Sequence, residues 1–204
     1  MKGKQVIVIN GSYRRGGITD QTVEEILRAV RDGGGQAETI DLLDVPLEFC
    51  TNCRSCTQKP DALPRGRCIH NDAMAGILDR VDAAEGIVLA SPINFYSCTA
   101  LMRRFIERLV VYAYWPWGYP RGPKDRAAGK LTKRAVLATS TACPAILARL
   151  LVPSATKAMK AAARCMGARV VDTVWLGMIA NAEKQRLTEQ QRKRAYQAGI
   201  RLIQ

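Results

Sequence analysis

The stretch that decides the fold is Gln5-Val6-Ile7-Val8-Ile9-Asn10-Gly11-Ser12-Tyr13-Arg14-Arg15-Gly16-Gly17-Ile18-Thr19. Its apolar start predicts a strand, and a polar loop with two arginines and two glycines then leads to a helical pattern that opens at Thr19. The amides of such a loop and of the first helical turn converge, and the helix dipole favours an anion there. Ser12 and Thr19 add hydroxyl groups, and Arg14 and Arg15 add positive charge. The stretch therefore predicts a phosphate site; the alternative is an ordinary strand-turn-helix connection that binds nothing.

The length and composition indicate one globular unit. The chain has 204 residues, of which 48% are hydrophobic, so we expect a single domain over residues 1–204 with a sizeable core. No apolar stretch approaches the length of a bilayer span, and the apolar run near the N-terminus is too short for a signal peptide. We therefore expect a cytoplasmic protein with no membrane partner.

The charge is strongly basic, at +13 from 31 basic and 18 acidic residues. This balance fits a nucleic-acid-binding protein or a basic enzyme with anionic ligands. The basic residues are spread over the segments 103–108, 124–134 and 192–194, and no zinc-finger spacing is present. We therefore expect an enzyme with no nucleic-acid partner. A basic nucleotide- or nucleic-acid-binding module stays as the second alternative.

Apolar patterns along the chain alternate between strand and helix. They predict strands at 5–10, 36–42, 86–91, 134–139 and 169–176. They predict helices at 19–32, from Asp72 onward, at 97–112 with Ser97 as its cap, at 145–166 with an interruption at Pro153, and at 188–203. Five such alternations favour an α/β protein with a doubly wound parallel sheet, whose ligands bind at the carboxyl ends of the strands. The loops 11–19, 91–96 and 140–144 then form the site, and 43–71 and 113–133 are irregular.

Three loops resemble those of the NAD(P)H-dependent FMN reductase family. The segment Gly11 to Thr19 matches the phosphate loop Gly-Ser-x-Arg-x-x-Gly-x-Thr. Ser91-Pro92-Ile93-Asn94-Phe95-Tyr96 is similar to the family's Ser-Pro-x-Tyr-x-x segment, which wraps the isoalloxazine ring, although Asn94 stands where tyrosine is common. Thr139 to Pro144 corresponds to the loop at the ring edge, with Ala142-Cys143 where the family often has Gly-Gly.

The resemblance implies a flavodoxin-like, five-stranded parallel sheet of order 2-1-3-4-5. It also implies an FMN-dependent oxidoreductase that takes hydride from NAD(P)H and reduces a small acceptor such as a flavin or a quinone. The residues it assigns to FMN are Ser12, Arg14, Gly17, Ile18, Thr19, Pro92, Ile93, Asn94, Phe95, Tyr96, Ser140, Thr141 and Ala142. No side chain is expected to act as catalyst, because the flavin carries the chemistry, and the lone His70 is expected to be a loop residue.

The resemblance further implies a homodimer or homotetramer. The aromatic-rich segment 113–123 is the surface that we expect a partner to cover.

Four of the seven cysteines, Cys50, Cys53, Cys56 and Cys68, follow the spacing x2, x2, x11. Without a secretion signal we expect no disulfides. Thiolates at this spacing can bind a [4Fe–4S] cluster or zinc, or stay as reduced thiols. The group is similar to that of the iron–sulfur flavoproteins, which share the expected fold but usually have a shorter last gap. We expect a reductase without a cluster; the first alternative is an iron–sulfur flavoprotein that transfers electrons through FMN and [4Fe–4S].

Overall fold

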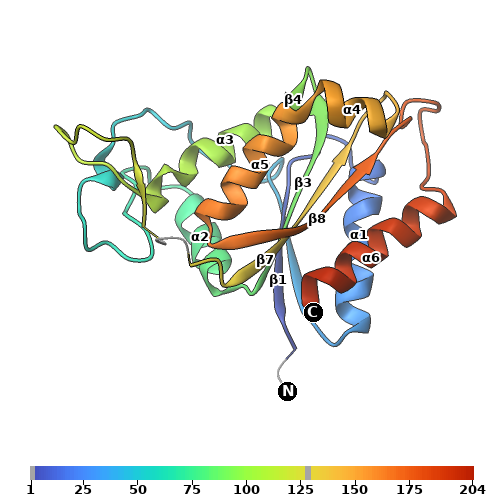
Figure 1. Ribbon diagram of the computed structural model, residues 1–204, viewed down its shortest axis with the longest axis horizontal. Helices are drawn as coiled ribbons and strands as arrows, with labels where there is room; N and C mark the ends of the chain where they lie inside the picture. Colours follow the sequence, from blue (N-terminus) through green and yellow to red (C-terminus); the bar gives the residue numbers. More distant parts are fainter. Residues whose placement is uncertain (1–2, 127–129) are drawn as a thin grey trace.

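The computed structural model describes residues 3–126 and 130–204. Five parallel strands form its central sheet, in the order β2-β1-β3-β7-β8 (Figure 1). These strands are β1 (Gln5–Asn10), β2 (Gln36–Asp41), β3 (Gly86–Asn94), β7 (Lys133–Ser140) and β8 (Ala168–Leu176). The order reverses between β2 and β3, so the carboxyl ends of β1 and β3 flank the switch point where ligands bind in such sheets. The predicted doubly wound sheet and its order are confirmed.

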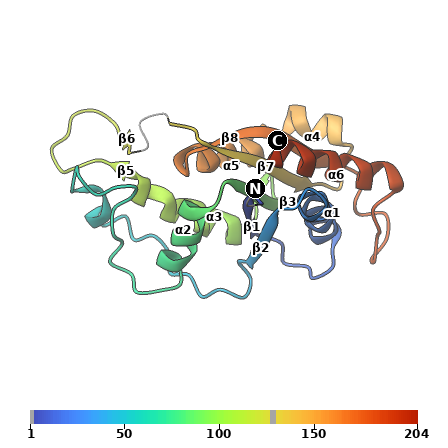
Figure 2. The ribbon, with the colours of Figure 1, turned by 90° about the horizontal axis from the view of Figure 1, so that it is seen from below.

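Helices cover both faces of the sheet (Figures 1 and 2). They are α1 (Ile18–Asp32), α2 (Met74–Ala83), α3 (Ala100–Arg108), α4 (Ala145–Leu151), α5 (Pro153–Cys165) and α6 (Glu189–Ile203). Residues of a strand alternate between the faces. Val8 therefore packs in an apolar cluster with residues of α1 and α6, whereas Ile9 packs in a second cluster with residues of α2, α3 and α5. None of the described helices combines the length and apolar character needed to cross a membrane.

The region after β3 differs from the sequence-based expectation. β3 continues to Asn94, and a short strand β4 (Ser97–Cys98) pairs back on it antiparallel. Ser97 is therefore part of a hairpin, and α3 is capped by Thr99, whose Oγ1 accepts a hydrogen bond from the amide of Met102. The predicted cap was wrong because the hairpin uses Ser97 in its ladder and delays the helix start by two residues.

Three other boundaries are informative. The helix predicted to residue 112 ends at Arg108 and continues as the 3₁₀ helix Leu109–Tyr112. The predicted loop 113–133 contains the strands β5 (Ala113–Tyr114) and β6 (Lys124–Asp125), and its residues 127–129 lie outside the described ranges. The helix predicted at 145–166 splits into α4 and α5 at Pro153, as expected for a residue without an amide hydrogen.

Residues 48–71 and 113–125 lie together at one end of the molecule, at the left of Figure 1, and are called the cysteine lobe. Two arginines hold it together. The guanidinium of Arg54 lies between the rings of Trp115 and Trp117, at 3.7 and 4.1 Å from their centres. The buried Arg126 donates hydrogen bonds to the carbonyl oxygens of Cys56 and Lys59. The segment that sequence alone marks as irregular is therefore an ordered extension of the fold.

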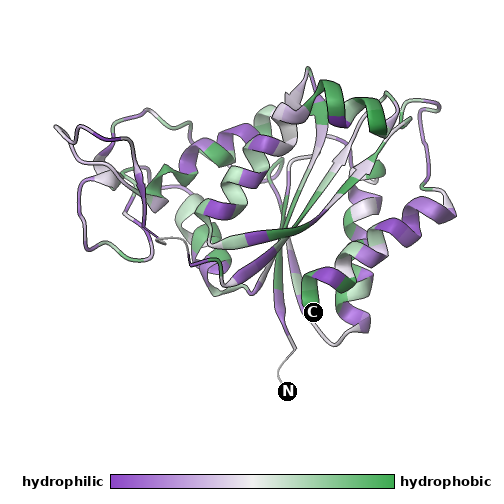
Figure 3. Cartoon of the chain, viewed as in Figure 1, coloured by the Kyte–Doolittle hydropathy of each residue, from purple (hydrophilic) through white to green (hydrophobic). Residues whose placement is uncertain are grey.

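Helix α4 is unusual because most of its apolar side chains face solvent. Figure 3 shows it as a strongly hydrophobic helix at the edge of the molecule. The exposed side chains are Ile146 at 73%, Leu147 at 47%, Leu150 at 73% and Leu151 at 71%. Exposed apolar surface of this kind marks a contact surface more often than an ordinary helix face.

Candidate functional site

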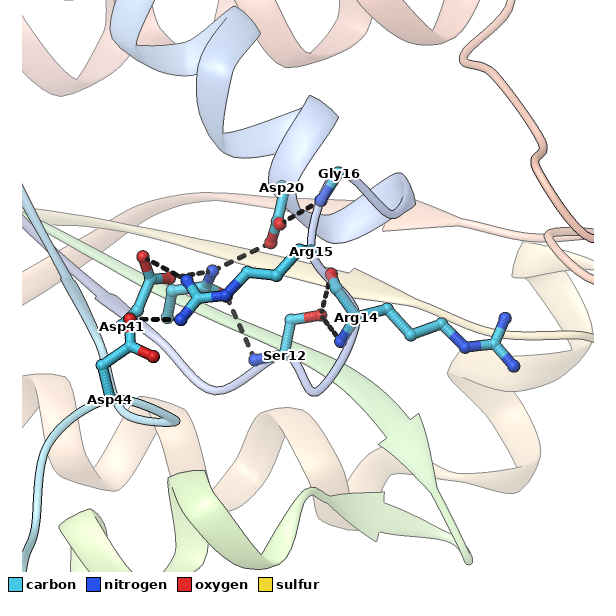
Figure 4. Close-up of polar contacts among 8 residues, drawn as sticks. Ser12, Arg14, Arg15, Gly16, Asp20, Asp41 and Asp44 are labelled. Atoms are coloured by element: carbon cyan, nitrogen blue, oxygen red, sulfur yellow. Dashed lines mark hydrogen bonds and ion pairs between the residues drawn. The ribbon is translucent and has the colours of Figure 1, made fainter.

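The loop after β1 folds tightly around its own polar groups (Figure 4). The amide of Ser12 donates to Asn10 Oδ1 at 3.1 Å, and Ser12 Oγ accepts from the amide of Arg14 at 3.2 Å. Gly16 has a φ of +66°, which favours glycine, and its amide donates to Asp20. α1 then begins at Ile18, one residue earlier than predicted, with Gly17 as its N-cap and no side-chain cap. Its first amides therefore stay available to an anion.

The two arginines of this loop point in opposite directions (Figure 4). Arg15 turns toward β2 and forms ion pairs with Asp41, at 2.9 Å, and with Asp44. The hydrogen bond with Asp44 is the main reason that the pKa of Arg15 is raised. Arg14 points away from these carboxylates and forms no ion pair with any described residue. Of the two, only Arg14 is free to neutralise a bound anion.

The loop after β7 meets the start of α1. Thr19 Oγ1 and Ser140 Oγ lie 3.1 Å apart, and both residues are buried. Thr19 is the second residue of α1, one position after the observed helix start, and its hydroxyl joins the loops after β1 and β7. Thr139 Oγ1 is buried and has no hydrogen-bond partner among the described residues. Buried hydroxyls normally have a hydrogen-bond partner, and a polar group of a bound ligand could be the partner of this one.

The remaining residues of this loop are tied to the chain that follows β8. The amide of Thr141 donates to the carbonyl oxygen of Leu176, and Thr141 Oγ1 lies 3.3 Å from Cys143 Sγ. A Cβ on Gly177 would lie 2.3 Å from the amide nitrogen of Ala145. This close approach fixes the loop that carries Thr141 and Ala142 against its neighbour.

The loop after β3 is a two-residue hairpin turn with aromatic residues at its tip. Asn94 pairs with Ser97, so Phe95 and Tyr96 are the two central residues, with φ of +45° and +64°. Positive φ at both positions is what a type I′ turn requires, and it normally selects Asn and Gly. The two rings stand edge to face with centres 5.8 Å apart, and the residues are 91% and 69% exposed. Strained, exposed aromatic residues of this kind are typical of functional sites.

Thr99 joins this hairpin to the loop after β1. Its Oγ1 donates to the carbonyl oxygen of Gly11 at 2.7 Å, and its amide donates to Ser91 Oγ at 3.0 Å. A Cβ on Gly11 would lie 2.9 Å from Met102 Cβ, so α3 packs directly on the loop. The structure thus brings the three predicted loops to the same edge of the sheet. The contact between Thr19 and Ser140 joins the loops after β1 and β7, and Thr99 joins the loops after β1 and β3.

Sequence analysis missed two residues that build the site, Thr99 and Asn10. Asn10 Nδ2 donates to Asp20 and to Asp41, so it connects the loop, α1 and β2. The sequence could have indicated Asn10, because it is the polar residue that ends the apolar run at residues 6–9. Thr99 gave no such signal, because Ser97 was an equally good cap in the sequence.

The four cysteines of the predicted metal group line one small cavity of about 20 Å³, together with Arg54, His70 and Arg108. That volume accommodates about one water molecule. No group of three or more His, Cys, Asp or Glu side chains within residues 3–126 and 130–204 is arranged to hold a metal ion. Burial raises the pKa of Cys56 to about 11, and Cys68 Sγ accepts a hydrogen bond from Arg108 at 3.5 Å. The cysteines are gathered as predicted, and all seven are free of disulfides, but they do not form a coordination site in this structure.

Comparison with curated proteins finds iron–sulfur flavoproteins. One from Archaeoglobus fulgidus is 27% identical over 112 residues, which cover 55% of this chain and 48% of that protein. One from Methanocaldococcus jannaschii is 34% identical over 104 residues, or 51% of each chain. The chain thus matches about half the length of these curated relatives.

Solved structures with the same fold cover nearly the whole chain. An NAD(P)H:quinone oxidoreductase from Methanothermobacter marburgensis superposes with a TM-score of 0.71 at 17% identity, over 98% of this chain and 96% of that one. An FMN-dependent NADH-azoreductase from Bacillus anthracis superposes with a TM-score of 0.72 at 14% identity, over 98% and 100%. The family model of the NADPH-dependent FMN reductases matches residues 5–180. This chain, with its flavodoxin-like fold, belongs to the NADPH-dependent FMN reductase family.

Proposed function

We propose that this protein is an FMN-dependent oxidoreductase that accepts hydride from NAD(P)H and reduces a small acceptor such as a flavin or a quinone. The observation that carries the proposal is the cradle at the carboxyl ends of β1, β3 and β7. It combines the start of α1 without a side-chain cap, the adjacent hydroxyls of Thr19 and Ser140, the Ser12 hydroxyl on the loop after β1, and Arg14, which forms no ion pair with a described residue. Such a cradle suits a phosphate monoester, and the family supplies FMN as the molecule that carries it.

Each loop would contribute differently to holding FMN. Ser12, Arg14 and Thr19, with the amides of Gly17 and Ile18, would bind the phosphate. The backbone from Pro92 to Tyr96 would lie along the ring, and Ser140, Thr141 and Ala142 would close its edge. Bound FMN would supply the hydride chemistry, so the protein's task is to bind, orient and shield the ring.

The test is direct. The protein is purified, its visible spectrum is recorded, and the apoprotein is titrated with FMN. Oxidation of NADH and of NADPH is then followed with a quinone and with free flavin as acceptors. We expect a yellow protein that binds FMN with a stoichiometry near one per chain. A colourless protein that fails to bind added FMN would contradict the proposal.

A second candidate is an iron–sulfur flavoprotein, favoured by one specific observation. The four cysteines line a single cavity, and α3 connects that cavity to the cradle. Thr99, which precedes α3, contacts Gly11, whereas Arg108 at its last turn contacts Cys68. Nine helical residues at about 1.5 Å each span roughly 14 Å. Iron and acid-labile sulfide in anaerobically purified protein would support this candidate, and their absence would exclude it.

We also propose that the protein works as a homodimer or homotetramer. The exposed apolar side chains of α4 support this proposal better than the segment 113–123 does. In that segment Trp115 is stacked on Arg54, and Trp117 is the one large apolar side chain that is mostly exposed. Light scattering at micromolar concentration is the test, and a fully active monomer would contradict it.

We further propose a cytoplasmic protein without nucleic-acid or membrane partners. The pairing of many cations supports this proposal. On α1 and α6, Arg28 and Arg192 pair with Glu25, and Arg194 and Arg201 pair with Asp172. These residues therefore offer less free charge to a polyanion than the net charge suggests. Salt-sensitive binding of duplex DNA at micromolar concentration would contradict the proposal.

A further inference from the structure

A groove of about 820 Å³ runs between the cysteine lobe and α2. One wall consists of parts of the segment 55–72, and the other contains Met74, Ala75 and Leu78 of α2 with Val111. This volume falls within the range of roughly 300–1,000 Å³ that is typical of small-molecule sites. The groove is separate from the FMN cradle, because its lining residues lie between 55 and 78, apart from Arg108 and Val111, and none of them is assigned to FMN.

The floor of the groove is apolar, and its rim is positively charged. Ile69, which is 60% exposed, and the exposed Ala75 supply apolar surface to the groove, and Met74, Leu78 and Val111 line it as nearly buried side chains at 2% exposure each. Lys59 and Arg67 lie on the rim, both are exposed, and neither forms an ion pair with a described residue. An apolar floor with free cations above it suits a ligand that has a flat apolar body and an anionic group.

The other charged residues of the groove are already neutralised by partners. Arg108 pairs with Asp72, which is the one carboxylate among the described residues that line the groove. Arg65 pairs with Asp79 and Asp82 of α2. The uncompensated charge that a ligand meets is therefore the charge of Lys59 and Arg67.

His70 adds an unused polar atom at the same place. Its Nε2 is buried and has no hydrogen-bond partner among the described residues, and the side chain lines both the groove and the neighbouring cysteine cavity. A ring nitrogen can donate or accept a hydrogen bond, depending on the tautomer. Buried polar atoms are rarely left unpaired, so this atom is a natural contact for a ligand group.

The groove is held open by rigid contacts. Gly66 crosses Cys56 so closely that a Cβ on Gly66 would lie 1.8 Å from the Cys56 carbonyl oxygen. The amide of Gly66 donates to the carbonyl oxygen of Val111, and Arg126 holds the carbonyl oxygens of Cys56 and Lys59. A preformed site needs little ordering when a ligand binds, which favours affinity.

We propose that this groove binds a small organic anion with a flat apolar body, such as an aromatic sulfonate or carboxylate, at a site distinct from the FMN cradle. The apolar floor holds the ring system, Lys59 and Arg67 hold the anionic group, and His70 Nε2 accepts from or donates to a polar substituent. This assignment does not depend on the redox activity of the protein.

The test uses naphthalene-2-sulfonate as the anionic probe and 2-naphthylmethanol as its neutral counterpart. Both are titrated calorimetrically into the full chain with saturating FMN present, so that the cradle does not bind the probe. We expect the sulfonate to bind more tightly than the alcohol, with an affinity that falls as salt is added. Equal affinities for the two probes would overturn the assignment of an anion site.

Two variants locate the binding. Lys59→Ala with Arg67→Ala should weaken sulfonate binding about tenfold, the sum expected for two partly exposed charge contacts. The matched control, Lys157→Ala with Lys160→Ala, removes two exposed cations of α5 and should leave it unchanged. Ala75→Trp fills the groove and should abolish binding, whereas Ala161→Trp on the exposed face of α5 should not. Sulfonate binding that survives Ala75→Trp, or that falls equally in the α5 controls, would overturn the proposal.

Discussion

Arg108 and Asp72 form a buried, two-point ion pair, with Nη1 2.6 Å from Oδ2 and Nη2 3.1 Å from Oδ1. Their side chains are 1% and 7% exposed. Asp72 also accepts from the amides of Glu48 and Met74, and Arg108 donates to the carbonyl oxygen of Glu48. The pair therefore ties the start of the cysteine lobe, the start of α2 and the end of α3 to one another.

Asp72→Asn should destabilise the protein by about 3–5 kcal/mol, because it leaves the Arg108 charge buried without its partner. The effect should depend on pH. Burial by itself raises the pKa of Asp72, but hydrogen bonds from Arg108 and from two amides outweigh it, and the pKa is lowered. A carboxyl whose folded pKa lies below its unfolded value of about 3.9 stabilises the fold above that pH, and the stabilisation disappears as pH falls through the folded pKa.

Thermal unfolding at neutral and at acidic pH measures both effects. The wild type should lose more stability than Asp72→Asn between the two. Asp79→Asn is the matched control, because Asp79 is an exposed carboxylate whose partner Arg65 keeps Asp82. Similar losses in the two variants at neutral pH would show that the buried pair has no special role.

Removing the two hydroxyls of the cradle should weaken FMN binding. Ser12→Ala with Thr19→Val should cost about one to three kcal/mol, since each hydroxyl is expected to make a charge-assisted hydrogen bond to the phosphate. Fluorescence titration of FMN measures the change. Thr22→Val is the control, because the buried Thr22 hydroxyl donates within α1 and not toward the loop. Unchanged FMN affinity in the folded double variant would remove these residues from the site.

The neighbouring arginines give a matched pair of variants. Arg14→Ala should weaken FMN binding about tenfold, and the loss should be larger at low salt, because it removes from the phosphate a cation that has no ion pair within the described part of the chain. Arg15→Ala should have a smaller effect, because Arg15 is engaged by Asp41 and Asp44. Titrations at two salt concentrations compare them. A greater loss for Arg15→Ala than for Arg14→Ala would reverse the assignment.

Replacing the two aromatic residues of the turn after β3 should raise the stability of the apoprotein and weaken FMN binding. Phe95→Asn with Tyr96→Gly places residues that tolerate positive φ where the turn needs them, so the apoprotein should gain about 1–2 kcal/mol. FMN affinity should fall, because the aromatic surface beside the ring is lost. Chemical denaturation and FMN titration together test the prediction. A variant that is less stable than the wild type and binds FMN with the same affinity would contradict it.

The fold was largely predictable because its signals are local and repeated. Val23, Ile26, Leu27 and Val30 recur at helical spacing, and all four are buried on one face of α1. The inner strands β1, β3 and β7 contain continuous apolar runs because helices cover both faces of the parallel sheet. The hairpin Asn94–Ser97 was missed because Phe95 and Tyr96 are poor turn residues, so the sequence conceals the turn that the structure adopts.

The site was predictable in outline but not in its contacts. The sequence placed hydroxyls and arginines on loops that the structure brings to one edge of the sheet, because loops that follow parallel strands meet there. It could not separate Arg14 from Arg15, since that difference depends on Asp41 and Asp44 lying beside the loop once β2 is paired with β1. Nor could it show that Thr19 contacts Ser140, a residue 121 positions away along the chain.

The last prediction concerns the cysteine cavity and the cradle. Serine at positions 50, 53, 56 and 68 should leave NAD(P)H-dependent flavin reduction largely intact, apart from losses of folding stability. The reason is distance: the cavity lies at the opposite end of α3 from Gly11, and none of the four thiols belongs to the loops of the cradle. Cys165→Ser, which replaces a cysteine outside both the cavity and the cradle loops, is the control.

NAD(P)H oxidation, acceptor reduction and iron content are measured on the same anaerobic sample. A reductase without a cluster contains no iron, and the fourfold variant keeps both activities. A zinc site predicts a different pattern, in which the variant is unstable while the flavin colour is unaffected. If the wild type contains stoichiometric iron, and the fourfold variant loses both the iron and acceptor reduction, electron transfer through a cluster would be established. We expect the first pattern, because the thiols surround a cavity that accommodates about one water molecule and are not arranged as metal ligands within the described chain.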